Sequence, residues 1–332
     1  MAEYTGIKFV CNSSGNFELI NKDWKYKNNV ATSLVRVSEV GICNSDFSRL
    51  FLGTGHKYPI TIGHEIVGSL ESAEGELSES LGQNICIFPL LPCHKCQYCV
   101  NQQFNLCGNY SYLGSREDGG LSSFIEVPNW NILIIKEKIK SNYLPLIEPV
   151  SVIFHAFKPF ARKDLKLLIT GSGFLSYLAL KIGEYLKFAE IGILSTSKSN
   201  QNLFADYFVD EKLKQMSEYT ACVDLSGNAN VVESVTRILS PGSTIVTVAN
   251  SRQDTLLTNY ARENILRKEL VFRGSWNSCF GGKRNDWLDA MHFLSQTSWL
   301  DYPTINIPLG DFPDYLQSKA FEFPKERIHV HV

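Results

Sequence analysis

The spacing of hydrophobic and polar residues changes near residue 150, and the two halves of the chain predict different folds. Before that point, short strand-like runs at residues 33–37, 66–69, 85–88 and 123–127 are separated by glycine, asparagine and serine turns. Runs of this length between turn residues are typical of antiparallel β structure. We therefore expect antiparallel sheets in the first half of the chain.

After residue 150, apolar runs alternate with helical patterns. Strand-like runs lie at residues 165–170, 191–194, 221–225, 243–249 and 270–272, and helical patterns around 201–207 and 231–239 stand between several of them. This alternation indicates βαβ units and a parallel sheet. The chain is thus predicted to be a mixed α/β protein, and 332 residues allow more than one domain.

A glycine turn follows the first strand of the second half. The apolar run at residues 165–170 leads into Gly171 and Gly173, and a helical pattern comes next. Strand, glycine turn and helix in this order predict a dinucleotide site, in which backbone N–H groups approach the pyrophosphate at the helix N-terminus. Ser176 stands where a third glycine is usual, so we expect weaker dinucleotide binding. The alternative is a turn with a structural role alone.

The end of the second strand in this half bears on the choice of nicotinamide cofactor. NAD sites carry an acidic residue about twenty positions after the glycine turn, where it binds the ribose 2′-hydroxyl. Here Ser195 stands at that place, followed by Ser197 and Lys198. Two hydroxyl donors and a cation suit a 2′-phosphate, so the sequence favours NADP. Alternatively, this stretch is a polar loop and NAD binds through other contacts.

Four of the nine cysteines stand close together, with two, two and seven residues between successive members: Cys93, Cys96, Cys99 and Cys107. Short C-x-x-C knuckles present sulfurs to one ion, which predicts a structural zinc site with four thiolates. Ferredoxin-type runs have a different final spacing and a following proline. Disulfides are disfavoured in a reducing compartment, and free cysteines rarely gather in such a polar loop.

Composition excludes several classes of protein. The chain has 32 basic and 34 acidic residues, with no basic run that would indicate nucleic-acid binding. It has no apolar stretch near the length of a transmembrane helix, and its first residues lack the pattern of a signal peptide. We therefore expect a soluble cytoplasmic protein that does not bind membranes or nucleic acid.

A second set of possible metal ligands is spread along the chain. Cys43, His64 and Glu148 offer one sulfur, one nitrogen and one oxygen donor, and three protein ligands plus an open position are typical of catalytic zinc. Glu65 is a candidate exchangeable ligand, and Asp46 is a candidate acceptor for the His64 ring. Spacing alone does not establish this group, because each residue also has an ordinary structural role available.

Several motifs together resemble those of the zinc-containing medium-chain alcohol and polyol dehydrogenases, along nearly the whole chain. They are G-I-C-x-S-D, G-H-E, the four-cysteine segment, E-P-V-S-V-x-x-H-A and the glycine turn, in that order. The sequence departs from the family at Ser176 and at Asn44, where glycine is usual after the zinc cysteine. Asn tolerates unusual backbone angles, so the second change is mild.

The resemblance implies a specific organisation. Residues 1–151 and 280–332 would form a GroES-like catalytic domain with antiparallel strands, and residues 152–279 a Rossmann domain. The four clustered cysteines would hold structural zinc, whereas Cys43, His64 and Glu148 would hold catalytic zinc with Glu65 near it. Ser45 would relay the substrate proton. The resemblance also implies two zinc ions per chain, NAD(P), and a homodimer or tetramer.

These expectations define a reaction. A zinc-dependent, NAD(P)-linked enzyme of this kind would interconvert a secondary alcohol of a polyol or polyol phosphate and the ketose. The alternatives are a biosynthetic sugar or sugar-phosphate reductase and a non-catalytic relative with weakened cofactor binding. A phosphorylated substrate would need a cation, for which Arg49, Lys57 and Arg116 are candidates because they flank the metal motifs.

Overall fold

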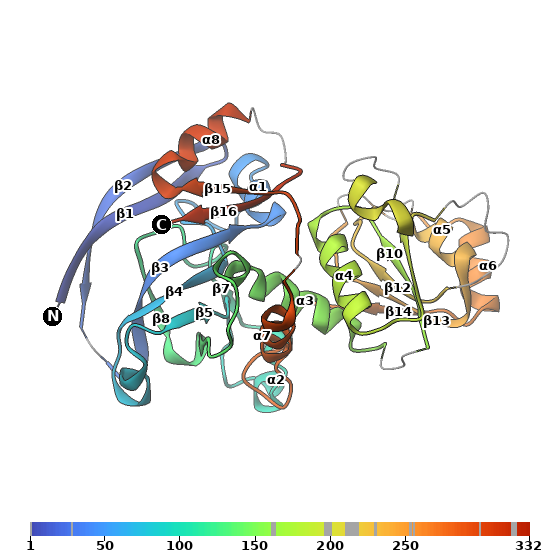
Figure 1. The fold of residues 1–332 in the computed structure, drawn as a ribbon, viewed down its shortest axis with the longest axis horizontal. Helices are drawn as coiled ribbons and strands as arrows, with labels where there is room; N and C mark the ends of the chain where they lie inside the picture. The colour runs from blue at the N-terminus through green and yellow to red at the C-terminus, as the bar shows by residue number, and fades with distance from the viewer. Residues whose placement is uncertain are drawn as a thin grey trace. The chain divides into compact units, whose positions relative to one another are not determined.

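The computed structural model describes residues 2–27, 29–160, 164–195, 201–209, 219–228, 231–251, 254, 256–298, 300–319 and 324–332. Contacts between residues divide the chain into two compact units. Unit 1 contains Met1–Pro149 and Cys279–Val332, and unit 2 contains Val150–Ser278. Unit 1 is therefore built from two separate stretches of the chain, whereas unit 2 is continuous. Figure 1 shows the elements of both units.

The largest sheet of unit 1 has seven strands and joins the two stretches of the chain. Its order is β15-β16-β3-β4-β5-β9, and β8 also pairs with β3. The strands are β3 (Thr32–Ile42), β4 (Glu65–Ser72), β5 (Asn84–Ile87), β8 (Phe124–Pro128), β9 (Ile132–Ile134), β15 (Thr304–Pro308) and β16 (Arg327–His331). The pairs are antiparallel except β15 with β16. Strand β16 thus lies directly beside β3.

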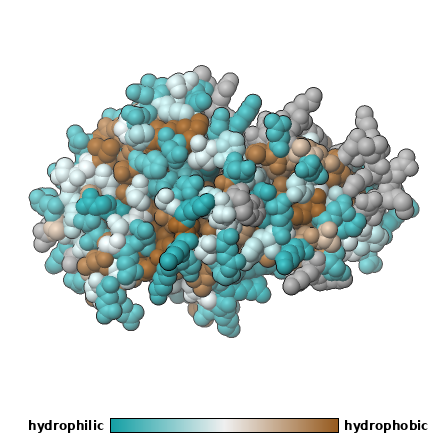
Figure 2. All heavy atoms as spheres, in the orientation of Figure 1, coloured by the Kyte–Doolittle hydropathy of each residue, from teal (hydrophilic) through white to brown (hydrophobic). Residues whose placement is uncertain are grey.

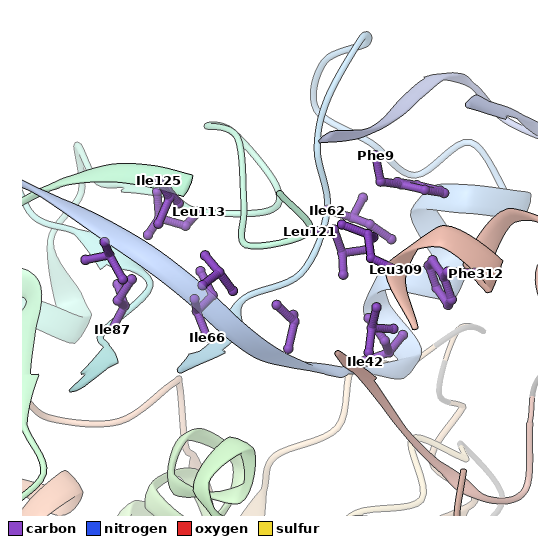
Figure 3. Packing of buried hydrophobic residues seen from close by; sticks show 14 of the residues in the cluster. Phe9, Ile42, Ile62, Ile66, Ile87, Leu113, Leu121, Ile125, Leu309 and Phe312 are labelled. Atoms are coloured by element: carbon purple, nitrogen blue, oxygen red, sulfur yellow. The ribbon is translucent and has the colours of Figure 1, made fainter. Parts of the chain in front are cut away.

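Apolar and polar residues alternate along these strands, so that one face of the sheet packs into the hydrophobic core. Val40 and Ile42 on β3, Ile66 on β4 and Val330 on β16 all belong to the hydrophobic cluster of unit 1. Figure 3 shows this cluster between the sheet and the segments around Phe9, Leu121 and Phe312. The intervening residues face the other side of the sheet. That other face carries the polar residues described below.

Smaller elements complete unit 1. Two-stranded sheets form between β1 (Ala2–Ser13) and β2 (Asn16–Tyr26), and between β6 (Leu90–Leu91) and β7 (Ser111–Tyr112). Its helices are α1 (Asn44–Phe51), α2 (Gln97–Val100), α7 (Asp286–Gln296) and α8 (Phe312–Ser318). Helix α3 (Ile147–Phe157) begins in unit 1 and continues into unit 2. Short 3₁₀ segments lie at Gly75–Ser80, Phe104–Leu106, Asn129–Asn131, Ser141–Leu146 and Leu309–Asp311.

Unit 2 is a parallel sheet of five strands in the order β11-β10-β12-β13-β14. The strands are β10 (Lys166–Thr170), β11 (Glu190–Leu194), β12 (Tyr219–Asp224), β13 (Leu239–Thr247) and β14 (Val271–Gly274). Its helices are α4 (Phe174–Tyr185), α5 (Val231–Ile238) and α6 (Asn259–Arg267), with a 3₁₀ segment at Gln201–Tyr207. The predicted mixed α/β class, with antiparallel strands first and a parallel sheet after residue 150, is confirmed.

Several local boundaries differ from the prediction; β3, for example, spans Thr32–Ile42, whereas only residues 33–37 were expected to form a strand. The segment 201–207, expected to be helical, is a 3₁₀ helix rather than an α-helix. Helix α5 ends at Ile238, and strand β13 starts at the next residue, Leu239. The strand therefore begins earlier than the predicted run at residues 243–249. Apolar residues at the junction satisfy both patterns, which is why periodicity alone did not separate them.

In the part of the chain that the structure describes, no helix is long and apolar enough to cross a membrane. On the face shown in Figure 2, hydrophobic residues are interspersed with hydrophilic ones.

Candidate functional site

Strand β3 delivers Cys43 to the start of helix α1. Cys43 is the N-cap of α1, and the carboxylate of Asp46 accepts a hydrogen bond from the Cys43 N–H at 3.1 Å. This contact is half of a capping box, which fixes the entry of the chain into the helix. Asp46 is completely buried. The sulfur of Cys43 is therefore held at a defined place at the end of the sheet.

His64 and Glu65 arrive at the same place from the start of β4. The loop before them is tied down by Asp118, which accepts hydrogen bonds from the Thr61 N–H at 2.9 Å and from Lys8 Nζ at 2.6 Å. His64 and Glu65 are both buried. The ligand atoms of Cys43, His64 and Glu65 all lie within 4.8 Å of one another. These three residues form what we call the first metal group.

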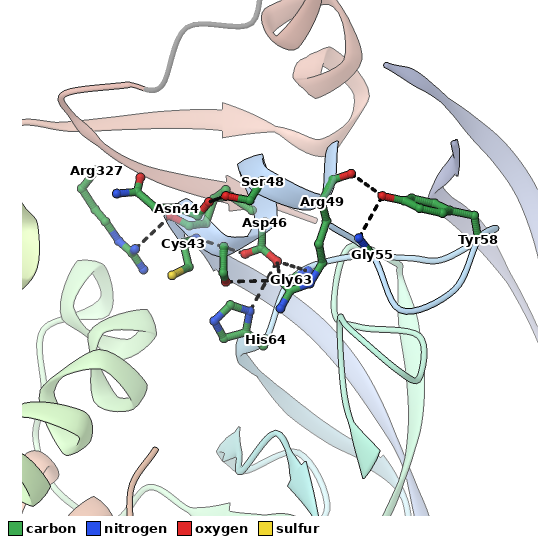
Figure 4. Close-up of polar contacts among 12 residues, drawn as sticks. Cys43, Asn44, Asp46, Ser48, Arg49, Gly55, Tyr58, Gly63, His64 and Arg327 are labelled. Carbon is green, nitrogen blue, oxygen red and sulfur yellow. Dashed lines mark hydrogen bonds and ion pairs between the residues drawn. The ribbon is translucent and has the colours of Figure 1, made fainter. Parts of the chain in front are cut away.

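Asp46 orients the imidazole of this group. Its Oδ1 lies 3.4 Å from His64 Nδ1 and 3.0 Å from Arg49 Nη1, as Figure 4 shows. The other ring nitrogen of His64, Nε2, is then left for Cys43 and for a metal ion. An acceptor on one imidazole nitrogen is the usual way in which proteins fix the tautomer of a metal-binding histidine. The predicted role of Asp46 is consistent with this geometry.

The electrostatics of the first metal group are strongly perturbed. Burial alone would lower the pKa of His64, but the charges and hydrogen bonds of Asp46 and Cys43 outweigh it and raise this pKa to about 10. Burial would raise the pKa of Cys43, yet its interactions with His64 lower it. The pKa of Asp46 is also lowered, against the effect of burial, mainly by His64. These shifts favour a Cys43 thiolate and an Asp46 carboxylate around the positive charge of His64. Two negative groups at this place are also suited to a metal cation.

Glu65 has a second partner in Arg327, which comes from strand β16. The two side chains form an ion pair, and both are buried. Gly41 lies opposite Glu65 on β3, and a Cβ atom at this position would collide with both side chains. Only glycine leaves room for the pair at this point of the sheet. Sequence reasoning missed Arg327, although the alternation of polar and apolar residues in R-I-H-V-H-V carried a signal.

Glu148 and Tyr112 lie near the first metal group without belonging to it. Glu148 stands in the first turn of α3 and is buried; burial raises its pKa, which the charge of His64 opposes. The ring of Tyr112 packs edge-on against His64, with 5.8 Å between the ring centroids. Burial and the charges of Glu148 and Cys43 raise the pKa of Tyr112 well above its ordinary value. Its phenol is therefore a hydrogen-bond donor at any physiological pH.

Of the three cations considered for a phosphate, one contacts the residues around the first metal group. Arg49 Nη1 donates to Ser45 Oγ at 3.2 Å as well as to Asp46. Lys57 instead forms an exposed ion pair with Glu117, and Arg116 lies over the ring of Tyr110. Arg49 thus holds the hydroxyl of Ser45 as an acceptor beside Cys43.

The four clustered cysteines form a second metal group. Their sulfurs lie within 4.8 Å of one another, and none is in a disulfide: Cys93, Cys96, Cys99 and Cys107. The Cys96–Cys99 sulfurs are 3.6 Å apart, and two further pairs are 3.9 Å apart. With zinc–sulfur bonds of about 2.3 Å, the edge of a tetrahedron is about 3.8 Å. The donor set therefore fits one tetrahedral zinc ion.

Backbone groups favour thiolates in this second group. The Cys93 N–H donates to the Cys107 sulfur at 3.3 Å. A hydrogen bond from the Cys99 backbone lowers the pKa of Cys96 to about 6, whereas burial raises the pKa of Cys99 to about 12. A bound cation would lower the pKa of all four cysteines, including Cys99, because it stabilises every thiolate around it.

The glycine turn of unit 2 has the backbone that the sequence predicted. Gly171 has a φ of +90°, a region that side chains disfavour, and Gly173 is the N-cap of α4. The hydroxyl of Ser176 is buried and donates to the Thr170 carbonyl at 3.4 Å. The serine that replaces the third glycine is thus accommodated beneath the turn.

Of the three residues predicted to select between NAD and NADP, the structure describes only Ser195. Ser195 follows β11, and its Oγ lies 3.0 Å from Ser172 Oγ in the glycine turn. Sequence reasoning had not singled out Ser172; the G-S-G sequence of the turn was its only signal. Ser197 and Lys198 lie outside the described residues. The two serine hydroxyls lie together where the turn meets the end of the second strand.

Comparison with known proteins agrees with this geometry. Residues 30–137 match the family model of the alcohol dehydrogenase GroES-like domain. Galactitol 1-phosphate 5-dehydrogenase of Escherichia coli K12 is 27% identical over 301 residues, which cover 86% of this chain and 87% of that protein. The crystal structure of galactitol-1-phosphate dehydrogenase from Escherichia coli matches with a TM-score of 0.90 and 23% identity, over 98% of this chain and 100% of that chain.

Two further solved structures contain a nicotinamide cofactor. A zinc-binding dehydrogenase from Sinorhizobium meliloti 1021, bound to NADP, matches with a TM-score of 0.86 and 20% identity over 99% of this chain and 100% of that one. A structure described as a short chain alcohol dehydrogenase from Escherichia coli CFT073, complexed with NADH, matches with a TM-score of 0.82 and 19% identity over 99% of each chain. The predicted combination of a GroES-like fold and a Rossmann fold is confirmed.

Proposed function

We propose that this chain, which contains an alcohol dehydrogenase GroES-like domain and is homologous to the zinc-type alcohol dehydrogenases, is a zinc-dependent NAD(P)-linked polyol dehydrogenase. Its substrate would be a secondary alcohol of a polyol or a polyol phosphate similar to galactitol 1-phosphate, and its product the ketose. The observation that carries this proposal is the first metal group, in which Cys43, His64 and Glu65 meet beside the buried Asp46.

The donor set of this group fits catalytic rather than structural zinc. Cys43 and His64 would supply sulfur and nitrogen, and Glu65 and Glu148 are the two carboxylates available for the third position. A mixed sulfur, nitrogen and oxygen set with an open position is the arrangement in which zinc acts on substrates. The four cysteines would hold a second, structural zinc ion, so we expect two ions per chain.

The proposed chemistry assigns a role to each neighbouring residue. A zinc ion held there would act as a Lewis acid that lowers the pKa of the substrate hydroxyl, and the nicotinamide would accept the hydride of the carbinol carbon. Ser45 would accept the hydroxyl proton and pass it to solvent, and Arg49 orients its Oγ at 3.2 Å. Asp46 keeps the imidazole of His64 in one tautomer. Arg49 is also the cation best placed for a substrate phosphate.

For the cofactor, we propose NADP in preference to NAD. Ser195 occupies the position where NAD sites carry an acidic residue, and the Ser172 hydroxyl lies beside it. A 2′-phosphate would therefore meet hydroxyl donors rather than a like charge. Ser197 and Lys198 remain part of the proposal from the sequence alone.

Assembly into a homodimer or tetramer is also part of the proposal. Strand β14 lies at the edge of the five-stranded sheet in the described part of unit 2, and Val271 and Phe272 on it are 51% and 45% exposed. An apolar strand edge of this kind pairs readily with a second copy of itself. Replacing Phe272 with Lys should then shift the protein toward the monomer in sedimentation.

A substrate panel tests the proposed function directly. The purified zinc protein should form NADPH from polyols and polyol phosphates, and the ratio of kcat/KM for galactitol 1-phosphate to that for galactitol tests the role of a phosphate. Equal values would remove the phosphate from the proposal. Reduction of ketoses without measurable oxidation of any polyol would favour the biosynthetic reductase. Absence of cofactor binding, measured by quenching of nicotinamide fluorescence, would favour the non-catalytic relative.

A further inference from the structure

One face of the sheet in unit 1 carries a row of buried polar residues. Strands β16, β3 and β4 pair so that His329 faces Gly41, and Gly41 faces Glu65. Residues that face one another across a sheet, and residues two apart along a strand, share the same face. This polar face therefore comprises Glu39, Gly41, Cys43, Glu65, Arg327 and His329. It lies opposite the apolar face that Val40, Ile42 and Val330 turn to the core.

Arg327 is the cation of this polar face. Its Nη1 donates to the Ile42 carbonyl at 2.9 Å, and its guanidinium pairs with Glu65. Burial lowers the pKa of Arg327 to about 10, and the charges of Cys43, Asp46 and Glu39 oppose this effect. Arg327 is thus charged at neutral pH, and a buried charge requires a counter-charge.

Glu39 supplies a second carboxylate within reach of the Arg327 charge. It is 7% exposed, and its Oε1 lies 2.9 Å from Nδ1 of His329, which is 1% exposed. Burial lowers the pKa of His329, so this imidazole is neutral at physiological pH and leaves the charge of the adjacent Glu39 uncancelled. The charge of Glu39 also acts on Arg327, whose pKa it raises.

Glu65 has two competing partners, because it pairs with Arg327 and also belongs to the first metal group. If Glu65 turned toward a metal ion, Arg327 would lose the counter-charge of Glu65 while its own guanidinium stayed buried. We propose that Glu39, oriented by His329, is a positioning residue that neutralises Arg327 when Glu65 engages the metal. This inference rests on the proposed zinc site, because it assigns control of the zinc affinity of that site to residues that are not themselves metal ligands.

The test compares three variants of the full-length, zinc-loaded protein. Glu39→Gln removes the second counter-charge, and His329→Gln removes the group that orients it. His292→Gln is the matched control, because His292 lies on helix α7 away from these strands, is exposed and contacts Gln296. Chelator competition would measure the affinity of the more labile zinc ion, and the electronic spectrum of cobalt-substituted protein would report the ligand geometry.

We expect Glu39→Gln to weaken binding of the labile ion about tenfold, as the loss of outer partners of metal ligands usually does. The cobalt spectrum should change with it, His329→Gln should have a smaller effect in the same direction, and His292→Gln none. Glu39→Asp should restore part of the affinity. The ion in the four-cysteine group should remain bound in every variant, which controls for misfolding.

Two results separate the inference from the proposed function. If wild-type protein binds a single zinc ion, in the four-cysteine group alone, the proposed catalytic site is wrong and the inference falls with it. If wild-type protein binds two ions and Glu39→Gln lowers only Tm, with affinity and cobalt spectrum unchanged, the role of Glu39 is structural. That second outcome overturns the inference and leaves the proposed function standing.

Discussion

Oδ1 of Asp46 lies 3.4 Å from Nδ1 of His64, with no solvent around the carboxylate. The same carboxylate accepts the Cys43 N–H and pairs with Arg49, so one buried group connects two candidate metal ligands and a cation. The Gly63 N–H donates to this carboxylate as well, at 3.4 Å. Because a buried carboxylate with four partners has little freedom to move, it fixes the imidazole before any metal binds.

Asp46→Asn should therefore weaken the metal site without removing a ligand. The amide is neutral and can present a donor to Nδ1, which favours the wrong tautomer of His64. We expect a loss of about 10- to 100-fold in affinity for the labile zinc ion. Calorimetric titration of metal-depleted protein would measure it, with Asp23→Asn, at an exposed carboxylate that accepts a hydrogen bond from Thr5, as a control that should leave this affinity near the wild-type value.

The two metal groups should be separable by mutation. Cys43→Ser should abolish turnover and leave one zinc ion per chain with the fold intact. Cys99→Ser should instead lower the free energy of unfolding, because a structural zinc site contributes its binding energy to folding. Metal analysis combined with thermal denaturation would check both. Full activity in metal-free protein would contradict the assignment of both groups.

Ser195→Asp should move the cofactor preference toward NAD. A carboxylate there repels a 2′-phosphate and accepts a hydrogen bond from the ribose 2′-hydroxyl. We expect the ratio of kcat/KM for NADP to that for NAD to fall about tenfold or more, the equivalent of about 1.4 kcal/mol. Steady-state kinetics at matched substrate would measure it. A wild-type ratio that already favours NAD tenfold would contradict the NADP assignment.

Asp118 should make the stability of unit 1 depend on acid. Burial would raise its pKa, but Lys8 and the Thr61 N–H lower it. A carboxyl with a lowered folded-state pKa stabilises the fold above its unfolded pKa, and this contribution is lost as pH falls through the folded value. Asp118→Asn should cost about 1 kcal/mol at neutral pH, since the pair is half-exposed and screened.

Chemical denaturation of both proteins at neutral and acid pH would test the Asp118 prediction. The difference between wild type and variant cancels the loss of metal in acid, which both share. It should shrink as pH falls below the ordinary aspartate pKa. A difference that stays constant across this range would assign the effect to packing rather than to charge.

Tyr112→Phe should change selectivity among alcohols. The variant keeps the ring against His64 and removes the phenol hydroxyl, which stays protonated because of burial and the nearby Glu148 and Cys43. Loss of one hydrogen bond to a second substrate hydroxyl should raise KM for polyols about tenfold. A secondary alcohol with a single hydroxyl should be unaffected. Tyr110→Phe is the matched control, and equal effects on both substrate types would indicate a packing defect.

The sequence predicted best those features whose residues are close together along the chain. The spacing of the four cysteines was sufficient to propose one ion, and the structure has all four sulfurs within 4.8 Å of one another, with three of the pairs 3.6–3.9 Å apart. Periodicity was likewise sufficient for the parallel sheet of unit 2, because each βαβ unit is local. It was less informative at the junction of Ile238 and Leu239, where apolar residues suit helix and strand equally.

The polar face of unit 1 could not be predicted in the same way. Arg327 and Ile42 are 285 positions apart, and only the pairing of β16 with β3 brings Arg327 to Glu65. The roles of Gly41 and Glu39 depend on that pairing and on its register. A local pattern contains no information about which distant strand becomes a neighbour, so these residues looked like ordinary members of half-polar strands.

The placement of β16 beside β3 has a consequence for the order of events during protein synthesis. Unit 2 is continuous in sequence, so it is complete as soon as the ribosome has passed Ser278. The sheet of unit 1 must wait for residues 327–331, which pair with β3. Until then, β3, which leads into Cys43, lacks its partner strand β16, so the sheet that positions the first metal group is incomplete. We therefore expect nascent chains to take up zinc at the four cysteines before they can complete the other site.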